Sequence, residues 1–293
     1  MEQVALGATG LAVSRLGLGC GGLGEARLTD AEAERVVLAA LDAGVTLFDA
    51  ARSYGDAEER LGRVLGTRRR DVVLSTKGGY GASGAEDWTA AAVTRGIDEA
   101  CARLGTDVID VFHLHSCPLD VLRRGDLLGA LDDARRAGKL RVAAYSGDGE
   151  ALAWAVASGH FGSVQCSVSL FDQGALAASV PVAAARSVGV LAKRALGNAP
   201  WRFAGRPPAD DVATYWDRMH ALALDPGPAG WDDTALRFAA FAPGVGAALV
   251  GTTSEAHLRA AAAIVARGPL ASDVTAALRA RWAAVGAGWP GTV

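Results

Sequence analysis

Four polar residues of different chemistry stand at or just after the ends of apolar, strand-like runs. Asp49 ends VTLFD, Tyr54 follows five residues later, Lys77 ends VVLSTK and His115 ends VIDVFHLH. Three successive βα units would deliver these residues, and in a parallel barrel the carboxyl ends of all strands open on one face. An acid, a phenol, an amine and an imidazole that converge there could donate a proton to a reacting oxygen.

The residue types suggest how that proton would move. A tyrosine hydroxyl ordinarily has a pKa of about 10, and a neighbouring ammonium stabilises its phenolate form. Lys77 could provide the ammonium, Asp49 could keep Lys77 charged, and His115 could orient a polarised carbonyl or relay a proton. Because no side chain donates hydride, the set implies a nicotinamide cofactor. His113 shares a strand face with His115 and is interpreted as structural.

The rest of the chain alternates strand-like and helical patterns. Eight strand candidates cover residues 15–20, 45–49, 71–77, 108–115, 140–147, 163–169, 188–194 and 245–253. Helical patterns cover residues 30–44, 57–66, 89–105, 121–138, 149–159, 175–189 and 254–266. Such alternation predicts parallel βαβ units, and eight of them favour a closed (β/α)8 TIM barrel over a doubly wound sheet. We expect one domain over residues 1–293.

Helix ends and connections add detail. Thr29-Asp30 offers an N-cap. Glycines placed to end helices in the left-handed conformation are Gly44, Gly66, Gly105, Gly138, Gly159 and Gly189. The Thr9-Gly10 turn predicts an N-terminal β-hairpin that caps one end of the barrel. Residues 195–230 hold five prolines and two tryptophans, which predicts a long loop after strand seven that covers the site or is a passive surface excursion.

Composition excludes several classes of function. The chain is 51% apolar and 21% charged, as soluble globular proteins are. Its net charge of −3 gives no case for nucleic acid or an acidic membrane, and it has no run of about 20 apolar residues. No leader-like segment is seen, and the four cysteines lack metal or disulfide spacing, so we expect reduced thiols, no metal site and a cytoplasmic location.

Taken together, these blocks resemble the aldo-keto reductase family from about residue 5 to residue 265. LGATGLAVSRLGLG is similar to the family's opening hairpin and first strand. GVTLFDAARSYGDAEERLGRVL, LSTK and RLGTDVIDVFHLHS are similar to the blocks that hold its aspartate and tyrosine, its lysine and its histidine. The resemblance implies that Asp49, Tyr54, Lys77 and His115 form a catalytic tetrad. It also implies that Tyr54 is the general acid in reduction and the base in oxidation.

The resemblance extends to the expected nicotinamide site. Ser146 and Gln165 match residues that hold the carboxamide, but Gly147 stands where the family commonly has asparagine, and Asp148 could compensate only in part. The loop holding Cys20 and Gly21 matches one that touches the cofactor. Lys193 and Arg194 either face the pyrophosphate or are ordinary loop charges.

LVGTTSEAHLRAAAA resembles the family's phosphate-binding segment. Gly251, Thr252 and Thr253 can offer amides and hydroxyls to a phosphate at a helix N-terminus. Relatives that prefer NADP(H) usually place lysine or arginine where Thr253, Ser254 and His257 stand. Arg259 either reaches the phosphate or faces solvent. Family habit favours NADP(H), and NAD(H) stays open.

Trp88, Cys117 and Trp201 are candidate walls for a small carbonyl or alcohol substrate, together with Phe203 and Trp216, although each could simply pack a loop. The favoured function is an NAD(P)(H)-dependent oxidoreductase that reduces an aldehyde or ketone, or oxidises the alcohol. One alternative is a non-catalytic, cofactor-binding regulatory subunit of the same fold. Another is a lyase or isomerase, since a fold alone does not set function. The oligomeric state is left open.

Overall fold

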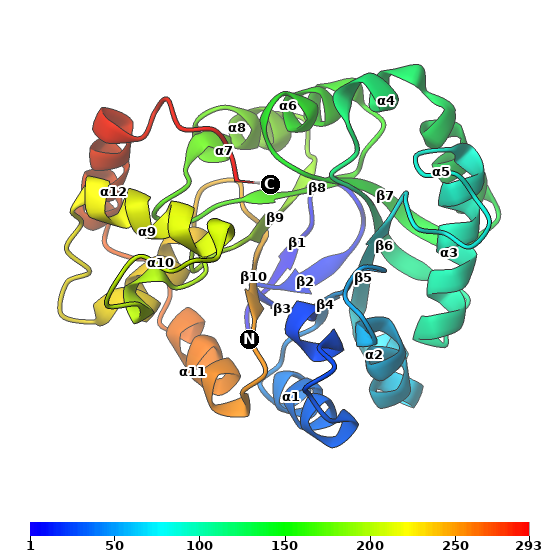
Figure 1. Cartoon of the computed structure of the whole chain (residues 1–293), viewed down its shortest axis with the longest axis horizontal. Coiled ribbons are helices and arrows are strands. Elements are labelled where there is room, and N and C mark those ends of the chain that lie inside the picture. Colours follow the sequence, from blue (N-terminus) through cyan, green and yellow to red (C-terminus); the bar gives the residue numbers. More distant parts are fainter. Residues whose placement is uncertain (293) are drawn as a thin grey trace.

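Eight parallel strands form a closed barrel in the computed structural model, which describes residues 1–292. Around the barrel the order is β10-β3-β4-β5-β6-β7-β8-β9, and Figure 1 looks into its carboxyl end. The strands are β3 (Leu16–Gly19), β4 (Leu47–Asp49), β5 (Val73–Gly78), β6 (Ile109–His115), β7 (Leu140–Ser146), β8 (Ser163–Ser167), β9 (Gly189–Lys193) and β10 (Ala247–Gly251). The predicted (β/α)8 barrel is confirmed.

Helices surround the strands, as the alternation predicted. They are α1 (Asp30–Asp42), α2 (Ala57–Leu65), α3 (Ala90–Leu104), α4 (Leu119–Arg124), α5 (Asp126–Arg136), α6 (Gly149–Ser158), α7 (Gly174–Ala177), α8 (Ser179–Ala185), α9 (Asp210–Leu222), α10 (Gly230–Ala240), α11 (Glu255–Ala266) and α12 (Ser272–Val285). Short 3-10 turns are η1 (Gly21–Gly24), η2 (Gly66–Asp71) and η3 (Pro200–Arg202). Of the helices in residues 1–292, none is both long and apolar enough to cross a membrane.

Two sequence predictions about helices were wrong. The pattern at 121–138 is two helices, because Gly125 adopts a φ of 87° between α4 and α5 and turns the chain. The segment 195–230 is not one long loop, since it contains η3 and the 13-residue helix α9. The prolines that suggested a loop lie outside α9, at the start of η3 or in the connecting segments. Their lack of an amide hydrogen there breaks no hydrogen bond of a helix interior.

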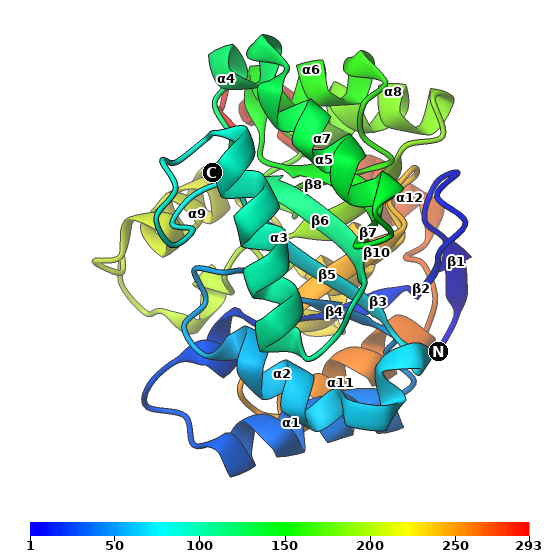
Figure 2. The same ribbon diagram turned by 90° about the vertical axis from the view of Figure 1, so that its right-hand side faces the viewer.

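The predicted hairpin closes the amino end of the barrel. β1 (Gln3–Ala5) pairs antiparallel with β2 (Ala12–Ser14), and Figure 2 shows this hairpin at the opposite end of the barrel from the C-terminus. Leu6, Leu11 and Val13 are buried together with inward-facing strand residues, among them Val73 and Val111. The hairpin therefore completes an apolar core inside the barrel that is separate from the core between barrel and helices.

Local signals were correct at most helix ends. Thr29 makes a capping box with Glu32 at the start of α1. Gly105 and Gly159 end α3 and α6 in the left-handed conformation. Gly189 was wrongly predicted as a helix cap, because it begins β9 and a Cβ there would lie 2.6 Å from Leu6 Cγ. This glycine allows the hairpin to approach the barrel closely.

The two-residue period of the strands decides what faces the barrel interior. On β5, Val73, Ser75 and Lys77 share a face, and the register pairs Ser75 with Asp49 and Lys77 with His113. The amino-terminal layer is apolar and the carboxyl-terminal layer is polar. The polar side chains Asp49, Lys77 and His115 thus lie at one end of the closed barrel.

Gly189→Ala tests the close approach of the hairpin. The added methyl would overlap Leu6, so we expect a loss of about 1–3 kcal/mol in the free energy of unfolding, measured in urea. In Gly129→Ala, on α5, the added Cβ meets no atom within 4 Å, so this control should stabilise the chain by about 0.5–1 kcal/mol. Equal stability of Gly189→Ala and the unaltered chain would show that the hairpin is not packed on β9.

Candidate active site

A buried ion pair lies beneath the carboxyl end of the barrel. Lys77 Nζ is 2.6 Å from Asp49 Oδ2, and it also donates to the Ala50 carbonyl oxygen at 2.8 Å. The side chains of Lys77 and Asp49 are 1% and 5% exposed. The third contact of Lys77 Nζ is the Tyr54 hydroxyl at 3.4 Å. The structure therefore brings Asp49, Lys77 and Tyr54 into one connected group.

Opposing effects set the charge of this lysine. Burial alone would lower the pKa of the Lys77 ammonium, but the Asp49 carboxylate and, less strongly, Tyr54 outweigh that effect and raise it. Lys77 is therefore a fixed positive charge beside the phenol. An ammonium in this position favours the negative phenolate that remains once the phenol gives up its proton.

A second layer supports the ion pair from the barrel interior. Ser75 Oγ donates to Asp49 Oδ1 at 2.8 Å, and His113 Nε2 lies 3.1 Å from the same Ser75 oxygen. Asp49 is thus held at both carboxylate oxygens. The sequence interpretation treated His113 as structural and did not select Ser75, although its position two residues before Lys77 places both on one strand face.

His115 stands beside Tyr54, with the two rings edge to face and their centroids 6.0 Å apart. Burial first, and then the charge of Lys77, lowers the pKa of His115 to about 3. The imidazole is therefore neutral at physiological pH. Its Nδ1 atom lies 2.9 Å from the hydroxyl of Tyr80, a residue that the sequence predictions did not include.

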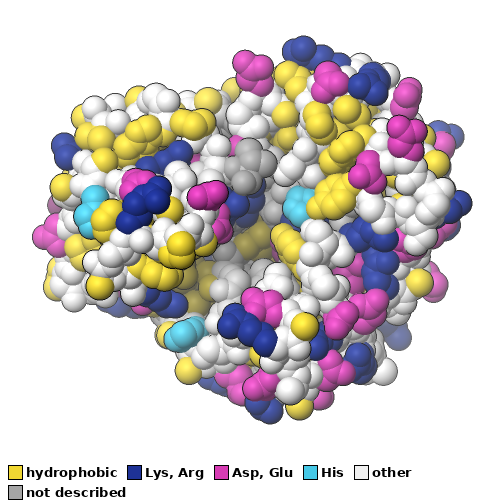
Figure 3. Space-filling model, viewed as in Figure 1, with side chains coloured by type: hydrophobic (Ala, Val, Ile, Leu, Met, Phe, Trp, Pro, Cys, Tyr) yellow, Lys and Arg dark blue, Asp and Glu magenta, His cyan; other side chains and the backbone are white. Residues whose placement is uncertain are grey.

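These groups open into a cavity of about 270 Å³. Figure 3 shows a hollow over the middle of the barrel, on the face that Figure 1 presents. Predicted residues that line the cavity are Gly21, Asp49, Tyr54, His115, Ser146, Gln165, Lys193, Arg194 and Gly251. Lys77 lies beneath this surface, and Cys20 is buried with its thiol turned toward the Leu18 carbonyl. In residues 1–292 no three His, Cys, Asp or Glu side chains are grouped to hold a metal ion.

One buried amide in this cavity is suited to a carboxamide ligand. Ser146 Oγ donates to Gln165 Oε1 at 3.1 Å, while Gln165 Nε2 is buried without a partner in the described part of the chain. An amide nitrogen in this state needs an acceptor. The presence of glycine at position 147 is explained by its neighbour, because a Cβ there would lie 2.4 Å from the Tyr145 hydroxyl oxygen.

Asp148 does not replace the absent asparagine. Its carboxylate accepts from the Ser167 amide and hydroxyl and pairs with Lys193 Nζ at 3.0 Å. The expectation that Asp148 compensates in part has no support in this geometry. Lys193 has its charge partly balanced, so it is less able to neutralise a pyrophosphate alone.

A second cavity of about 140 Å³ adjoins the first, since Gly251 lines both. Thr252 and His257 line it, together with Arg202 and Asp232, which lie 3.4 Å apart. Ser254 caps α11 through its hydroxyl. A Cβ on Gly22 would lie 2.9 Å from Thr253 Cγ2, so these loops nearly touch. Arg259 instead faces α1, where it lies 3.8 Å from Asp42.

The three candidate substrate residues lie outside the lining of both cavities. Cys117 is 1% exposed, and burial raises the pKa of its thiol to about 12. Trp201 stacks on Trp231 with ring centroids 5.7 Å apart. Trp88 packs edge to face against Tyr80 and so lies one side chain away from His115.

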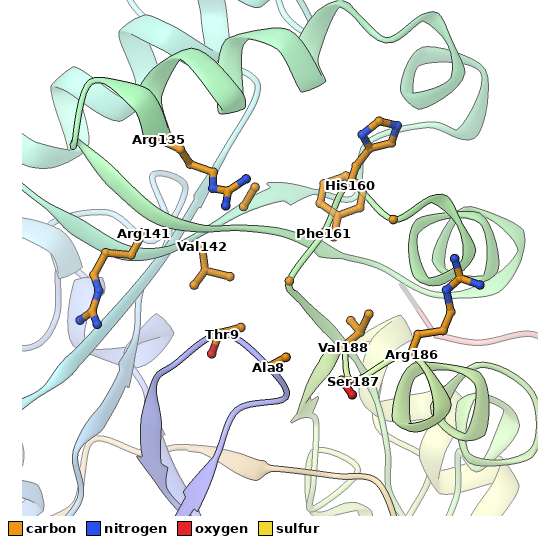
Figure 4. Close-up of a pocket in the computed structure, with 13 residues that line it drawn as sticks. Ala8, Thr9, Arg135, Arg141, Val142, His160, Phe161, Arg186, Ser187 and Val188 are labelled. Carbon is orange, nitrogen blue, oxygen red and sulfur yellow. The ribbon is translucent and has the colours of Figure 1, made fainter.

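A larger opening of about 590 Å³ lies at the other end of the barrel. Figure 4 shows Thr9 of the hairpin turn on its floor, with Arg135, Arg141 and Arg186 around its rim. Two of these cations have acidic partners, Asp132 for Arg135 and Asp110 for Arg141. None of Asp49, Tyr54, Lys77 and His115 lines this opening, so its size does not make it the candidate active site.

Comparison with known proteins agrees with this geometry. The model of the Aldo/keto reductase family matches residues 15–283. The chain belongs to this family. It is 37% identical over 152 residues to the 6-dehydroglucose reductase of Novosphingobium aromaticivorans, a match that covers 48% of the chain and 50% of that protein.

Two further relatives extend the likeness along the chain. The D-threo-aldose 1-dehydrogenase of Pseudomonas sp. is 29% identical over 262 residues, covering 75% of this chain and 79% of that protein. The holo form of the aldo-keto reductase AKR11C1 from Bacillus halodurans has the same fold, with a TM-score of 0.85, 22% identity and coverage of 98% and 97%. The chain spans about half the length of the first curated relatives it matches.

The two buried histidines predict sensitivity to acid. Burial lowers the pKa of His113 to about 4, and it lowers the pKa of His115 further, to about 3. An unfolded histidine has a pKa of about 6.5, so below that pH the unfolded state binds more protons and stability falls. In His113→Gln, the slope of unfolding free energy between pH 6.5 and 4.5 should shrink by up to about 1.4 kcal/mol per pH unit.

Urea unfolding at several pH values measures that slope. The same substitution at the exposed His160 is the control and should leave the slope as it is in the unaltered chain. If His113→Gln also leaves the slope unchanged, the folded protein must already carry a proton on His113, against the burial seen here.

Proposed function

We propose that this protein is a nicotinamide-dependent oxidoreductase that reduces an aldehyde or ketone to an alcohol, or catalyses the reverse reaction. The observation that carries the proposal is the buried Asp49–Lys77 pair at 2.6 Å, with the Tyr54 hydroxyl 3.4 Å from Lys77 and the His115 ring beside it. A charged lysine held against a phenol at the floor of a cavity suits proton transfer to a developing alkoxide. The relatives' names, a reductase and a dehydrogenase, support the same reaction class.

Each side chain has a separate task in this proposal. Tyr54 gives its proton to the substrate oxygen, and Lys77 stabilises the phenolate that results. Asp49 keeps Lys77 charged and in place, and neutral His115 donates a hydrogen bond to the same substrate oxygen. A bound nicotinamide supplies or accepts the hydride at the carbon. In oxidation the Tyr54 phenolate takes the proton from the alcohol.

The residues present fit a nicotinamide dinucleotide. The unpartnered Gln165 Nε2 and the neighbouring Ser146 hydroxyl would hold the carboxamide. Gly21 and Gly251, without side chains, leave room for the dinucleotide at the cavity wall. Arg194 lines the same cavity and would face the pyrophosphate with Lys193.

We further propose NADP(H) as the preferred cofactor and an intracellular, cytoplasmic setting. Arg202 and His257 line the second cavity and would meet the 2′-phosphate, while Thr252 and the start of α11 would hold other phosphate oxygens. Asp232 opposes this preference through its contact with Arg202. The four cysteines are free thiols, which suits a reducing compartment.

Tyr54→Phe tests the proton donor. The substitution removes one hydroxyl, so turnover of a carbonyl panel that includes sugar aldehydes should fall by at least about 10²-fold. Tryptophan fluorescence titration should show that the variant still binds cofactor. Full turnover in Tyr54→Phe would exclude the assigned role. Cofactor binding without turnover in the unaltered protein would instead favour the non-catalytic subunit.

Parallel titrations with NADPH and NADH test the cofactor preference. NADPH should bind more tightly, and Arg202→Ala should weaken NADPH binding by about tenfold or more, because a charged hydrogen bond contributes about 1.5–3 kcal/mol. NADH binding should change little. Arg206→Ala is the matched control, because Arg206 is an exposed arginine of the same segment paired with Asp217. If the unaltered protein binds NADH more tightly, the preference for NADP(H) is excluded. Asp232 would then neutralise the charge of Arg202 and so favour NAD(H).

A further inference from the structure

One glutamate outside the cavity holds two loops at the carboxyl end of the barrel. Glu99 lies on α3, the helix in front of β5 and β6 in Figure 2. Its Oε2 accepts from Arg52 Nη1, in the loop at residues 50–56. Its Oε1 accepts from the Ser83 amide at 3.0 Å, in the loop at residues 79–89. The side chains of the ion pair are 22% and 21% exposed, so water and salt screen it only in part.

The immediate surroundings keep this carboxylate charged. Burial would raise the pKa of the Glu99 carboxyl, but hydrogen bonds from Ser83 and then the Arg52 guanidinium outweigh burial and lower it. Among residues 1–292, Glu99 is the one acid within 4 Å of the Arg52 guanidinium. A neutral side chain at position 99 would therefore leave Arg52 half-buried without an anion.

The loop at residues 50–56 forms the surroundings of Lys77. The Ala50 carbonyl oxygen and the Tyr54 hydroxyl lie 2.8 and 3.4 Å from Lys77 Nζ. The Arg52 amide, between them along the chain, donates to the Lys77 carbonyl oxygen at 3.2 Å. The contact of 3.4 Å is longer than the usual nitrogen–oxygen hydrogen bond of about 2.7–3.2 Å. The phenol therefore depends on the backbone of its own loop, and not on Lys77 alone, for its position.

The loop at residues 79–89 reaches the histidine of the site. Tyr80 stacks on His115, with ring centroids 5.7 Å apart and planes inclined by 26°. The Tyr80 hydroxyl also donates to Ser53 Oγ, in the other loop, at 3.1 Å. The two loops thus contact each other as well as one carboxylate, so Glu99 holds them as one unit.

A second ion pair holds Glu99 from the side of the core. Arg103 Nη1 lies 3.7 Å from Glu99 Oε2, and Arg103 Nε donates to the buried Glu58 at 2.6 Å. Glu58 also accepts from the hydroxyl of Thr76, the residue before Lys77 on β5. Charges alternate along this row of side chains, and each carboxylate lies beside a guanidinium. The row therefore connects β5 to both loops.

We propose that Glu99 is a positioning residue: through Arg52 it fixes the loop that holds the Tyr54 hydroxyl against the reacting oxygen. This role rests on the proposed oxidoreductase function. Proton transfer requires the donor within hydrogen-bonding reach of the substrate oxygen, so a small displacement of the phenol lowers the rate of the reaction. Glu99 lies outside the lining of the 270 Å³ cavity, so loss of its charge should leave cofactor binding as it is.

Glu99→Gln keeps the shape of the side chain and removes its charge. The displaced phenol should lower kcat for carbonyl reduction about tenfold, while the affinities for NADPH and NADH, measured by tryptophan fluorescence, stay unchanged. In a Tyr54→Phe background the same substitution should cause no further fall in kcat, because the hydroxyl that it positions is gone. Arg52→Gln should cause a similar loss, and the Arg52→Gln, Glu99→Gln double variant should lose no more than either single variant.

Asp98→Asn is the matched control, because Asp98 is the neighbouring acid of the same helix and pairs with Lys139 instead. It should leave kcat unchanged. Hydrogen–deuterium exchange supplies a readout that needs no turnover. The amides of residues 50–56 should exchange faster in Glu99→Gln than in the unaltered protein, and Asp98→Asn should not change their exchange.

An unchanged kcat in Glu99→Gln overturns the inference, and so does an equal loss with and without the Tyr54 hydroxyl, which would mean a general structural role. Unchanged exchange of residues 50–56 in Glu99→Gln, or an equal effect of Asp98→Asn, also overturns it. Failure of the proposed function would be seen separately, as absent carbonyl reduction by the unaltered protein.

Discussion

The ion pair between Lys77 and Asp49 is the interaction on which the rest of the site depends. Two charges removed from water lose several kcal/mol of solvation each, and only close contact with further hydrogen bonds offsets that loss. Here the lysine has the carboxylate, a backbone carbonyl and the phenol of Tyr54, while Ser75 satisfies the second carboxylate oxygen. Removing either charge would leave the other buried and unpaired, so the fold is stable only when the two side chains are in contact.

That requirement constrains the barrel. The pair forms only when β4 and β5 adopt the register that sets Asp49 opposite Ser75, because a shift by one residue would turn each side chain to the opposite face. The apolar layer below, closed by the hairpin residues Leu6 and Leu11, excludes water from the amino end. In this arrangement the polar layer lies against apolar side chains on its amino-terminal side and lines the cavity on its carboxyl-terminal side.

Neutral histidines are a second feature of this buried layer, chiefly because burial lowers the pKa of each ring. Desolvation and the Lys77 charge both lower the pKa of His115, which keeps the ring uncharged. The Tyr80 hydroxyl oxygen lies 2.9 Å from Nδ1 of this ring. The site thus combines a fixed charge at the phenol with an uncharged imidazole beside it.

Sequence reasoning was reliable for the barrel, the hairpin and the helix caps, and it selected the side chains that the structure joins into one group. Strand and helix periods and cap residues are local signals that can be read without a three-dimensional structure. It was unreliable where distant segments meet. The helix α9 was taken for a loop and Gly189 for a cap. In the second case, a local pattern does not show that Gly189 lies against Leu6 of the hairpin.

By itself, the sequence determined which residues lie at strand ends and which face of each strand they share, because both follow from a period of two residues. Only the tertiary structure decided what those residues touch. Tyr80 contacts His115, His113 contacts Ser75, and Lys193 pairs with Asp148. Such contacts join residues far apart along the chain, and short-range distances between them arise only once the barrel has closed.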